Sequence, residues 1–156
     1  MMKRIKIILM MLCLCGGFFA GLDASAEMKY VYDQANLLTD EEEQEFQSYA
    51  ESMKDIWKMN FMVVTTDDAE GKSSMEYADD FYDYNGYGFG ANDDGILVVY
   101  KPGKEGNRKI HITTHGKGVS EFSDSALDNI RDEMISYLVD DDYDSAFICY
   151  LDMVED

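Results

Sequence analysis

The sequence predicts an α/β protein, specifically a three-layer α/β/α sandwich around a small mixed sheet. Two short, unbroken apolar runs, "FMVV" at 61–64 and "ILVVY" at 96–100, are typical of strands that are covered on both faces. A helical pattern lies between these two runs, so the two strands should be parallel. The segment 108–114 alternates apolar and polar residues and should pair back onto the second strand as a hairpin.

The first helix should begin after Thr39, because Thr39 and Glu42 form a capping box and acidic residues follow the cap directly. Apolar residues then recur at helical spacing on its predicted inward face: Phe46, Tyr49, Ala50, Met53, Ile56 and Trp57. A second capping box, Ser73 with Glu76, begins another helix. Its predicted inward residues are Met75, Ala78, Phe81 and Tyr82.

Two further helices are predicted after the hairpin. Ser123 caps the first, and its inward residues are Leu127, Ile130, Met134 and Leu138. Asp141 or Asp142 opens the second, with Tyr143, Ala146, Phe147, Tyr150, Leu151 and Val154 inward. The predicted order is therefore helix, strand, helix, strand, strand, helix, helix, with no internal repeat and no long linker.

Residues 1–26 have the features of a cleaved export signal. Lys3, Arg4 and Lys6 precede the apolar run "IILMMLCLCGGFFAGL", and "ASA" at 24–26 supplies the small residues that a signal peptidase accepts. The run is shorter and more interrupted by glycine than a membrane span of roughly 20 residues. We therefore expect residues 27–156 to form one domain that is secreted or held in the extracytoplasmic cell envelope, with no membrane span.

The charge of the chain restricts its partners. With 13 basic and 32 acidic residues in 156, the formal net charge is −19. Such a chain repels nucleic acid and anionic membranes, so we expect neither as a partner. It suits divalent cations or basic proteins, although a merely well-solvated surface would have the same composition.

The stretch "YNGYGFGANDDGILVVY" at 84–100 raises the question of nucleotide binding. A dinucleotide site needs a strand, then glycines, then a helix whose N-terminus faces the pyrophosphate. Here the predicted order is helix, glycines, strand, and no Walker lysine follows. The fold is therefore expected to be Rossmann-like but not nucleotide-binding, with no organic cofactor. EF-hand and zinc spacings are also absent from the sequence.

Asp93 and Asp94 are the predicted metal ligands. They precede the second predicted strand, and the "THGKG" turn at 114–118 follows the third, so a hairpin would place both segments at one rim of the sheet. Adjacent carboxylates beside backbone oxygens suit a hard cation, Ca²⁺ or Mg²⁺. The alternative is that Asp94 only turns the chain into the strand. Asp33, Asp67 and Asp68 should lie at the opposite rim.

Four segments together resemble the TPM domain family: "VYDQANLLTDEEEQEF", "SMEYADDFYDYNGYGFGANDDGILVVY", "ITTHGKGVSEFSD" and "DDDYDSAF". The resemblance covers residues 30–155 and implies an exported α/β/α domain. It also implies a partner-binding or assembly role in the cell envelope, because family members include a photosystem II repair protein and a receptor modulator. Acid phosphatase activity is attributed to a plant member and divalent-cation binding to others. The alternative function is therefore a metal-assisted acid phosphatase using the same aspartates, and whether the chain is an enzyme stays open.

Individual positions both match and depart from this family. Asp94 and Gly95 match its Asp-Gly motif, and 116–118 matches its Gly-x-Gly motif. His115 stands where the family more often has Thr or Ser, and Ala146 replaces a frequent glycine, which puts local ligand geometry in doubt. Bacterial relatives often continue into a transmembrane helix beyond the domain. No catalytic residue can be assigned from the sequence.

Overall fold

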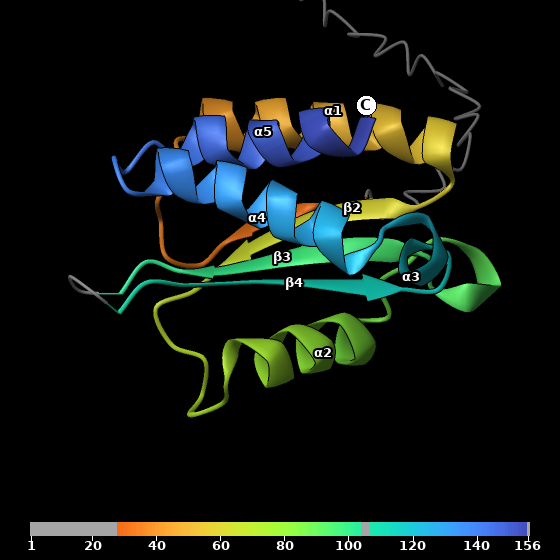
Figure 1. Cartoon of the computed structure of the whole chain (residues 1–156), viewed down its shortest axis with the longest axis horizontal. Helices are drawn as coiled ribbons and strands as arrows, with labels where there is room; N and C mark the ends of the chain where they lie inside the picture. The colour runs from red at the N-terminus through yellow and green to blue at the C-terminus, as the bar shows by residue number, and fades with distance from the viewer. Residues whose placement is uncertain (1–27, 104–106, 156) are drawn as a thin grey trace, which may run out of the picture.

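The computed structural model describes residues 28–103 and 107–155, which form a four-stranded sheet between two layers of helices (Figure 1). The strand order follows the chain: β1 (Val31–Asp33), β2 (Asn60–Thr65), β3 (Gly95–Lys101) and β4 (Lys109–His115). The first three strands are parallel, and β4 pairs antiparallel with β3. The predicted small mixed sheet of an α/β protein is confirmed.

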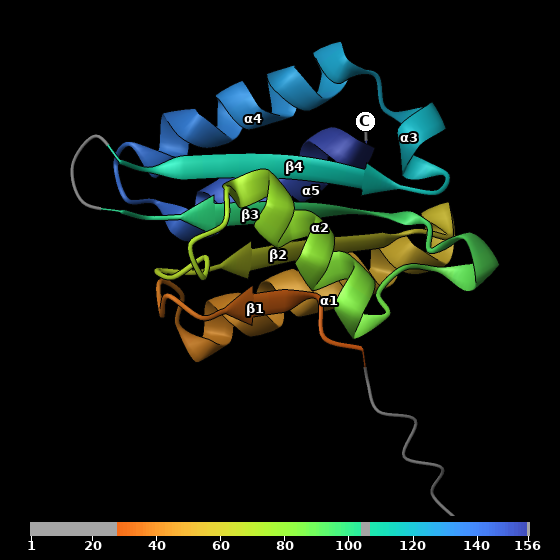
Figure 2. The same cartoon turned by 90° about the horizontal axis from the view of Figure 1, so that it is seen from below.

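Helices cover both faces of this sheet, as the three-layer prediction requires (Figures 1 and 2). On one face lie α1 (Asp40–Trp57), α4 (Asp124–Leu138) and α5 (Tyr143–Glu155), and on the other lies α2 (Ser74–Asn85). A one-turn helix, α3 (Gly118–Glu121), and a 3₁₀ turn, η1 (Gly90–Asn92), complete the described elements. Within the described residues, no helix is both long enough and apolar enough to cross a membrane.

Helices α1 and α2 begin directly after the predicted N-cap residues, Thr39 and Ser73. The Thr39 hydroxyl accepts a hydrogen bond from the Glu42 N–H, and the Glu42 carboxylate accepts one from the Thr39 N–H. Ser73 and Glu76 form the same reciprocal pair at the start of α2. Each pair satisfies two backbone donors that the first helical turn would otherwise leave without partners.

The core lies on both faces of β2 and β3, whose residues are buried throughout except for Lys101. The inward faces predicted for α4 and α5 supply buried side chains to it, including Met134, Phe147 and Tyr150. The predicted inward orientation was wrong for two residues, since Ile56 is 70% exposed and Met75 is 55% exposed. They lie in the last turn of α1 and the first turn of α2, and helical spacing alone cannot indicate where the covering surface stops.

The sheet has one strand more than predicted, because β1 was missed. Its three residues are too few to display a period-two pattern. Pairing with β2 defines it instead: the Val63 N–H donates to the Tyr30 carbonyl over 2.9 Å, and the Gln34 N–H donates to the Thr65 carbonyl over 3.1 Å. The single turn of α3 was missed for the same reason of length.

The two connections between parallel strands leave the sheet in opposite directions. Both move one place along the strand order, but α1 crosses one face and α2 crosses the other (Figure 2). The two crossovers are consequently of opposite hand, and the loops that follow β1 and β2 diverge. Adjacent loops that diverge at the carboxyl ends of parallel strands open a crevice, which is the usual ligand position in open α/β sheets.

Candidate functional site

The glycine-rich segment between α2 and β3 is a tightly folded corner. Gly86 ends α2 in the left-handed conformation at φ 64°, and its N–H donates to carbonyls of the last helical turn. Gly88 has φ 118°, and a Cβ there would lie 2.3 Å from the Cα of Asp93. Phe89 and Asp94 then exchange backbone hydrogen bonds of 2.9 and 3.1 Å. Glycine is required at position 88 because the chain packs against its own backbone.

Asp94 joins this corner to the turn after β4. Its Oδ1 accepts a hydrogen bond of 2.6 Å from the Lys117 N–H. Gly116, at φ 53°, leaves room for that contact, since a Cβ there would lie 2.2 Å from the same oxygen. The structure therefore brings the aspartate and the 116–118 turn to one rim, as the predicted hairpin requires. One carboxylate oxygen of Asp94 is committed to holding the turn.

The backbone oxygens expected to help hold a cation at this rim already accept hydrogen bonds. The Asp93 carbonyl accepts from the Tyr82 hydroxyl at 2.9 Å. The Asp94 carbonyl accepts from the N–H groups of Asn60 and Phe89 at 3.0 and 2.9 Å. Among the residues described, no group of three or more His, Cys, Asp or Glu side chains is arranged to hold a metal ion. The donor set therefore fits only a weakly held cation that draws its remaining ligands from water.

The other polar residues of this rim serve packing. The His115 ring stacks on the Tyr82 ring with centroids 3.7 Å apart and planes 5° from parallel. Burial lowers the pKa of His115, and the carboxylates of Asp83, Asp79 and Asp93 only partly oppose that effect. Lys117 Nζ donates to the Trp57 carbonyl at 3.3 Å. The rim thus has a neutral, stacked histidine and a lysine that the protein itself engages.

A different feature occupies the opposite rim, where β1 and β2 end. A crevice of about 550 Å³ lies between the segment after β1, the loop 66–72 and α2. Its lining consists of carboxylates, one lysine, aromatic rings and neutral polar groups: Asp67, Asp68, Glu70, Asp80, Lys72, Tyr77, Phe81, Tyr84, Gln34, Thr66 and Asn85. This is the position that the diverging loops predict.

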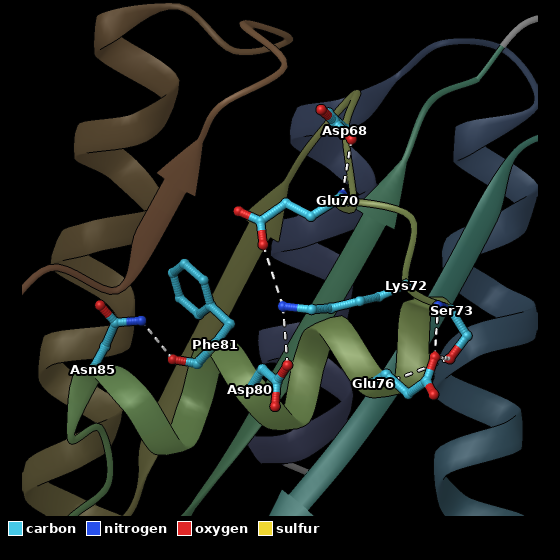
Figure 3. Close-up of polar contacts among 8 residues, drawn as sticks. All are labelled: Asp68, Glu70, Lys72, Ser73, Glu76, Asp80, Phe81 and Asn85. Atoms are coloured by element: carbon cyan, nitrogen blue, oxygen red, sulfur yellow. Dashed lines mark hydrogen bonds and ion pairs between the residues drawn. The ribbon is translucent and has the colours of Figure 1, made fainter.

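The loop 66–72 is shaped by its own hydrogen bonds. The Thr66 hydroxyl donates to the Asp68 carbonyl at 2.8 Å. Figure 3 shows that Asp68 Oδ1 accepts from the Glu70 N–H, at 2.8 Å. Glu70 and Gly71 both have positive φ, at 55° and 77°, which turns the chain towards α2. Asp67 lies before this turn and is exposed.

Lys72 joins the loop to α2. Its Nζ lies 3.0 Å from Asp80 Oδ2 and 3.2 Å from Glu70 Oε2 (Figure 3). Hydrogen bonds to Asp80, and then to Glu70, raise the pKa of Lys72. The single ammonium group of the crevice is therefore shared between two carboxylates, while Asp67 and Asp68 add further negative charge.

Aromatic side chains form the α2 side of the crevice. The Tyr77 hydroxyl donates to Gln34 Oε1 at 3.1 Å, which fixes that ring beside the segment after β1. Phe81 meets Tyr32 edge-to-face with centroids 5.3 Å apart. Tyr84 is 83% exposed. Carboxylates beside aromatic faces together favour cationic groups, since both attract positive charge.

Some residues of this rim were predicted from the sequence. Asp67 and Asp68 lie at the rim opposite Asp94, as predicted. Asp33 lies there too, but its Oδ2 accepts from the Leu38 N–H at 2.8 Å and its Oδ1 from the Thr65 hydroxyl, so it is structural. Lys72 and Asp80 were missed. The sequence did carry a signal for a site here, namely a pair of aspartates directly after a buried parallel strand. Ligands bind at the carboxyl ends of such strands.

The fold and this crevice define a class of protein, namely small α/β/α domains with a polar crevice at the carboxyl ends of their parallel strands. The chain belongs to the TPM domain family, which its sequence matches over residues 31–156. The resemblance found in the sequence motifs is confirmed.

The chain is similar to a curated bacterial protein and to solved structures. "UPF0603 protein YdjH" of Bacillus subtilis (strain 168) is 29% identical over 130 residues, which are 83% of this chain and 48% of that protein. The chain therefore spans about half the length of this relative. Two solution NMR structures of N-terminal domains share the fold. The domain of the cg2496 protein from Corynebacterium glutamicum has a TM-score of 0.61 at 17% identity, covering 85% of this chain and 83% of its own. A domain from P. gingivalis has a TM-score of 0.69 at 19% identity, covering 84% and 82%.

Proposed function

We propose that this TPM domain is an exported binding module that holds a basic segment of a protein partner in the crevice beside α2. The observation that supports this function is the composition of the crevice: four carboxylates and three aromatic rings surround one lysine. That lysine is already paired with Glu70 and Asp80. A lysine or arginine from a partner would therefore meet carboxylates and ring faces with no competing free cation beside them.

Export is part of the proposal. It rests on the basic, apolar and small-residue succession of residues 1–26, which lie outside the described residues. A location in the cell envelope or the medium would present the acidic crevice to other exported proteins. Mass measurement of the protein recovered from these compartments tests this part, and a mature chain that begins at Glu27 is the expected result.

A divalent cation at Asp93 and Asp94 is a subordinate part of the proposal. The two carboxylates are neighbours at the corner between η1 and β3, and their ordinary cation would be Ca²⁺ or Mg²⁺. Because Asp94 also holds the Lys117 N–H, a bound ion would tighten the corner. It would lie at the rim opposite the crevice, so it would act on stability and not directly on the partner.

The alternative function, a metal-assisted acid phosphatase, is less well supported. Such an enzyme needs a fixed positive charge where negative charge develops on the transferred phosphoryl group. Of the lysines at the two rims, Lys117 and Lys72 already contact protein oxygens, and Lys58 Nζ lies 5.9 Å from the centre of the Phe89 ring. Hydrolysis of a model phosphate ester, measured with Mg²⁺ and Ca²⁺ at acid pH, should not exceed background. Turnover that disappears in Asp94→Asn would establish this alternative instead.

Titration with a blocked oligoarginine peptide tests the binding function. The double variant Asp67→Asn/Asp68→Asn should bind about tenfold more weakly, since it loses two charge pairs, each of modest strength. Asparagine keeps the oxygen that accepts from the Glu70 N–H, so the loop should hold its shape.

The matched control is Asp55→Asn/Asp140→Asn, which removes the same charge from exposed positions outside the crevice. It should change the affinity less than twofold. Equal losses in both double variants would mean that the net charge alone attracts the peptide, and the proposed site would be abandoned.

A further inference from the structure

We infer that the outer edge of β4 is a second binding site, which takes an extended segment of a partner protein as an additional strand of the sheet. This edge is separate from the crevice beside α2. Two observations support the inference: the backbone groups that β4 points outward, and two hollows between β4 and α4.

β4 differs from the other edge of the sheet in length and regularity. β1 has only three residues, which is one way that proteins protect an edge from pairing with other chains. β4 has seven, contains no proline, and pairs residue for residue with β3 without a bulge. Within the described residues no strand pairs with its outer side. A long, regular edge of this kind is a ready template for another strand.

The direction of the backbone groups identifies the residues that would pair. The Tyr100 carbonyl accepts from the Thr66 N–H on the β2 side, so its backbone groups point away from β4. Successive residues alternate in direction, and therefore Val99 and its alternate neighbours point towards β4. Their partners, which include His111 and Thr113, use their N–H and C=O groups within the sheet. The residues between them point theirs outward: Ile110, Ile112 and Thr114.

Two hollows lie between β4 and α4, and Ile110 lines both. The larger, about 220 Å³, is also lined by Ile112, Leu127, Asp124, Asp128 and Arg131. The smaller, about 160 Å³, is lined by Tyr100, Leu138, Ile135, Val139, Arg108 and Lys109. Alternate side chains of a strand added to β4 would be spaced about 7 Å apart on this face and would enter the hollows.

The smaller hollow is lined largely by apolar side chains, namely Ile110, Ile135, Leu138 and Val139. Ile135 and Val139 are 38% and 60% exposed, which is unusual for such large apolar side chains on one helix face. This hollow therefore suits an apolar side chain.

The charged residues of the larger hollow indicate which polar side chain the incoming segment would carry. Asp124 and Asp128 line the larger hollow, and Arg131 pairs with Asp128 at 2.8 Å. Asp124 forms no ion pair within the described residues, so a lysine or arginine of the incoming segment would complement it. A partner segment that alternates apolar and basic residues on one face meets these demands. A second copy fits less well, because each chain has a net charge of −19.

Amide hydrogen exchange, followed by NMR on the whole domain, tests the inference. The probe is a seven-residue peptide in which threonine alternates with leucine and lysine. Peptide binding should slow exchange at the outward N–H groups of Ile110, Ile112 and Thr114. His111 and Thr113, which are already bonded to β3, should change little. The same peptide N-methylated at alternate residues should bind about tenfold more weakly, since it loses several backbone hydrogen bonds.

Variants of the protein complete the test. Ile112→Pro removes an outward N–H without breaking a bond to β3, as proline permits on an edge strand, and should weaken peptide binding about tenfold relative to Ile112→Val. If Ile112→Pro fails to fold, the N-methylated peptide on the wild type still decides. Asp67→Asn/Asp68→Asn should leave this binding unchanged, so the crevice proposal can fail separately. Equal binding of the N-methylated peptide would overturn the inference. So would protection of the three amides that grows with protein concentration alone, which would identify a second copy as the occupant.

Discussion

Where β3 begins, Asp94 accepts a hydrogen bond from the Lys117 N–H and its carbonyl accepts two more, whereas at the other end of the sheet Asp67 stands exposed beside a crevice of about 550 Å³. Both ends are rich in aspartate. At the glycine-rich end the chain folds back on itself, and the polar groups around Asp94 are satisfied within the protein. At the crevice end two loops diverge (Figure 2), and Asp67 and Asp68 are exposed.

Acidic residues near a sheet end therefore do not by themselves indicate a ligand site. The direction of the connecting loops decides whether such residues are enclosed by the protein or left exposed. The β3–β4 hairpin and the glycine corner close one end, so Asp94 acts as a structural acceptor. The opposite faces covered by α1 and α2 leave the other end open, so Asp67 stays exposed there.

The largest effect should come from Gly88→Ala, because a Cβ at this position would lie 2.3 Å from the Asp93 Cα and φ is 118°. Neither the backbone nor the loop can give way cheaply. We expect a loss of about 3 kcal/mol in the free energy of unfolding, measured by urea denaturation. Gly90→Ala is the control: its φ is 71° but the space is open, so it should lose about 1 kcal/mol. Similar losses in both variants would show that the corner is looser than the structure indicates.

Two aspartates of the crevice end should differ in their effect on stability. Asp33→Ala removes the acceptor for the Leu38 N–H and the Thr65 hydroxyl, and Thr65 is fully buried. It should destabilise the domain by about 1 to 3 kcal/mol, since buried donors lose their partners. Asp67→Ala changes an exposed side chain and should stay within about 0.5 kcal/mol of the wild type. A large loss from Asp67→Ala would mean that its carboxylate holds the loop and is not free for a ligand.

Calcium should raise the melting temperature slightly if a cation binds at Asp93 and Asp94. With a dissociation constant on the order of 10⁻⁴ to 10⁻³ M, a tenfold excess over that constant adds about 1.4 kcal/mol through linkage. Asp94→Asn should remove most of the rise, although its remaining side-chain oxygen still accepts from the Lys117 N–H. Asp67→Asn is the control at the opposite end. Should only the control lose the effect, the cation lies in the crevice and the contrast between the two ends is sharper still.

The smallest effect concerns pH. Burial lowers the pKa of His115 in the folded protein, so between that value and its ordinary pKa of about 6.5 the unfolded chain binds a proton that the folded chain does not. This contribution to stability is present above about pH 6.5 and is lost as the pH falls below it. Asp144, whose pKa burial raises, acts in the opposite direction. The test is therefore the difference between wild type and His115→Gln in urea midpoints from about pH 7 to pH 5. Parallel curves for the two proteins would contradict a lowered pKa of this half-buried histidine.

Several elements could be predicted from the sequence because their causes are local. The capping boxes at Thr39 and Ser73 act within four residues, and the buried strands β2 and β3 were recognisable from continuous apolar runs. The alternation in 108–114 likewise predicted a strand that pairs back onto β3 as a hairpin. Asp94 was also placed correctly against the 116–118 turn, since a hairpin fixes that neighbourhood.

What only the tertiary structure decided depends on contacts between distant segments. β1 exists through its pairing with β2, and Ile56 is exposed although Trp57 beside it in the last turn of α1 is partly buried. The crevice needs α1 and α2 on opposite faces, which brings Gln34, Lys72 and Asp80 around Asp67. No spacing within a segment encodes that arrangement, because helix and strand periods specify which side of an element is buried but not which face of the sheet it covers.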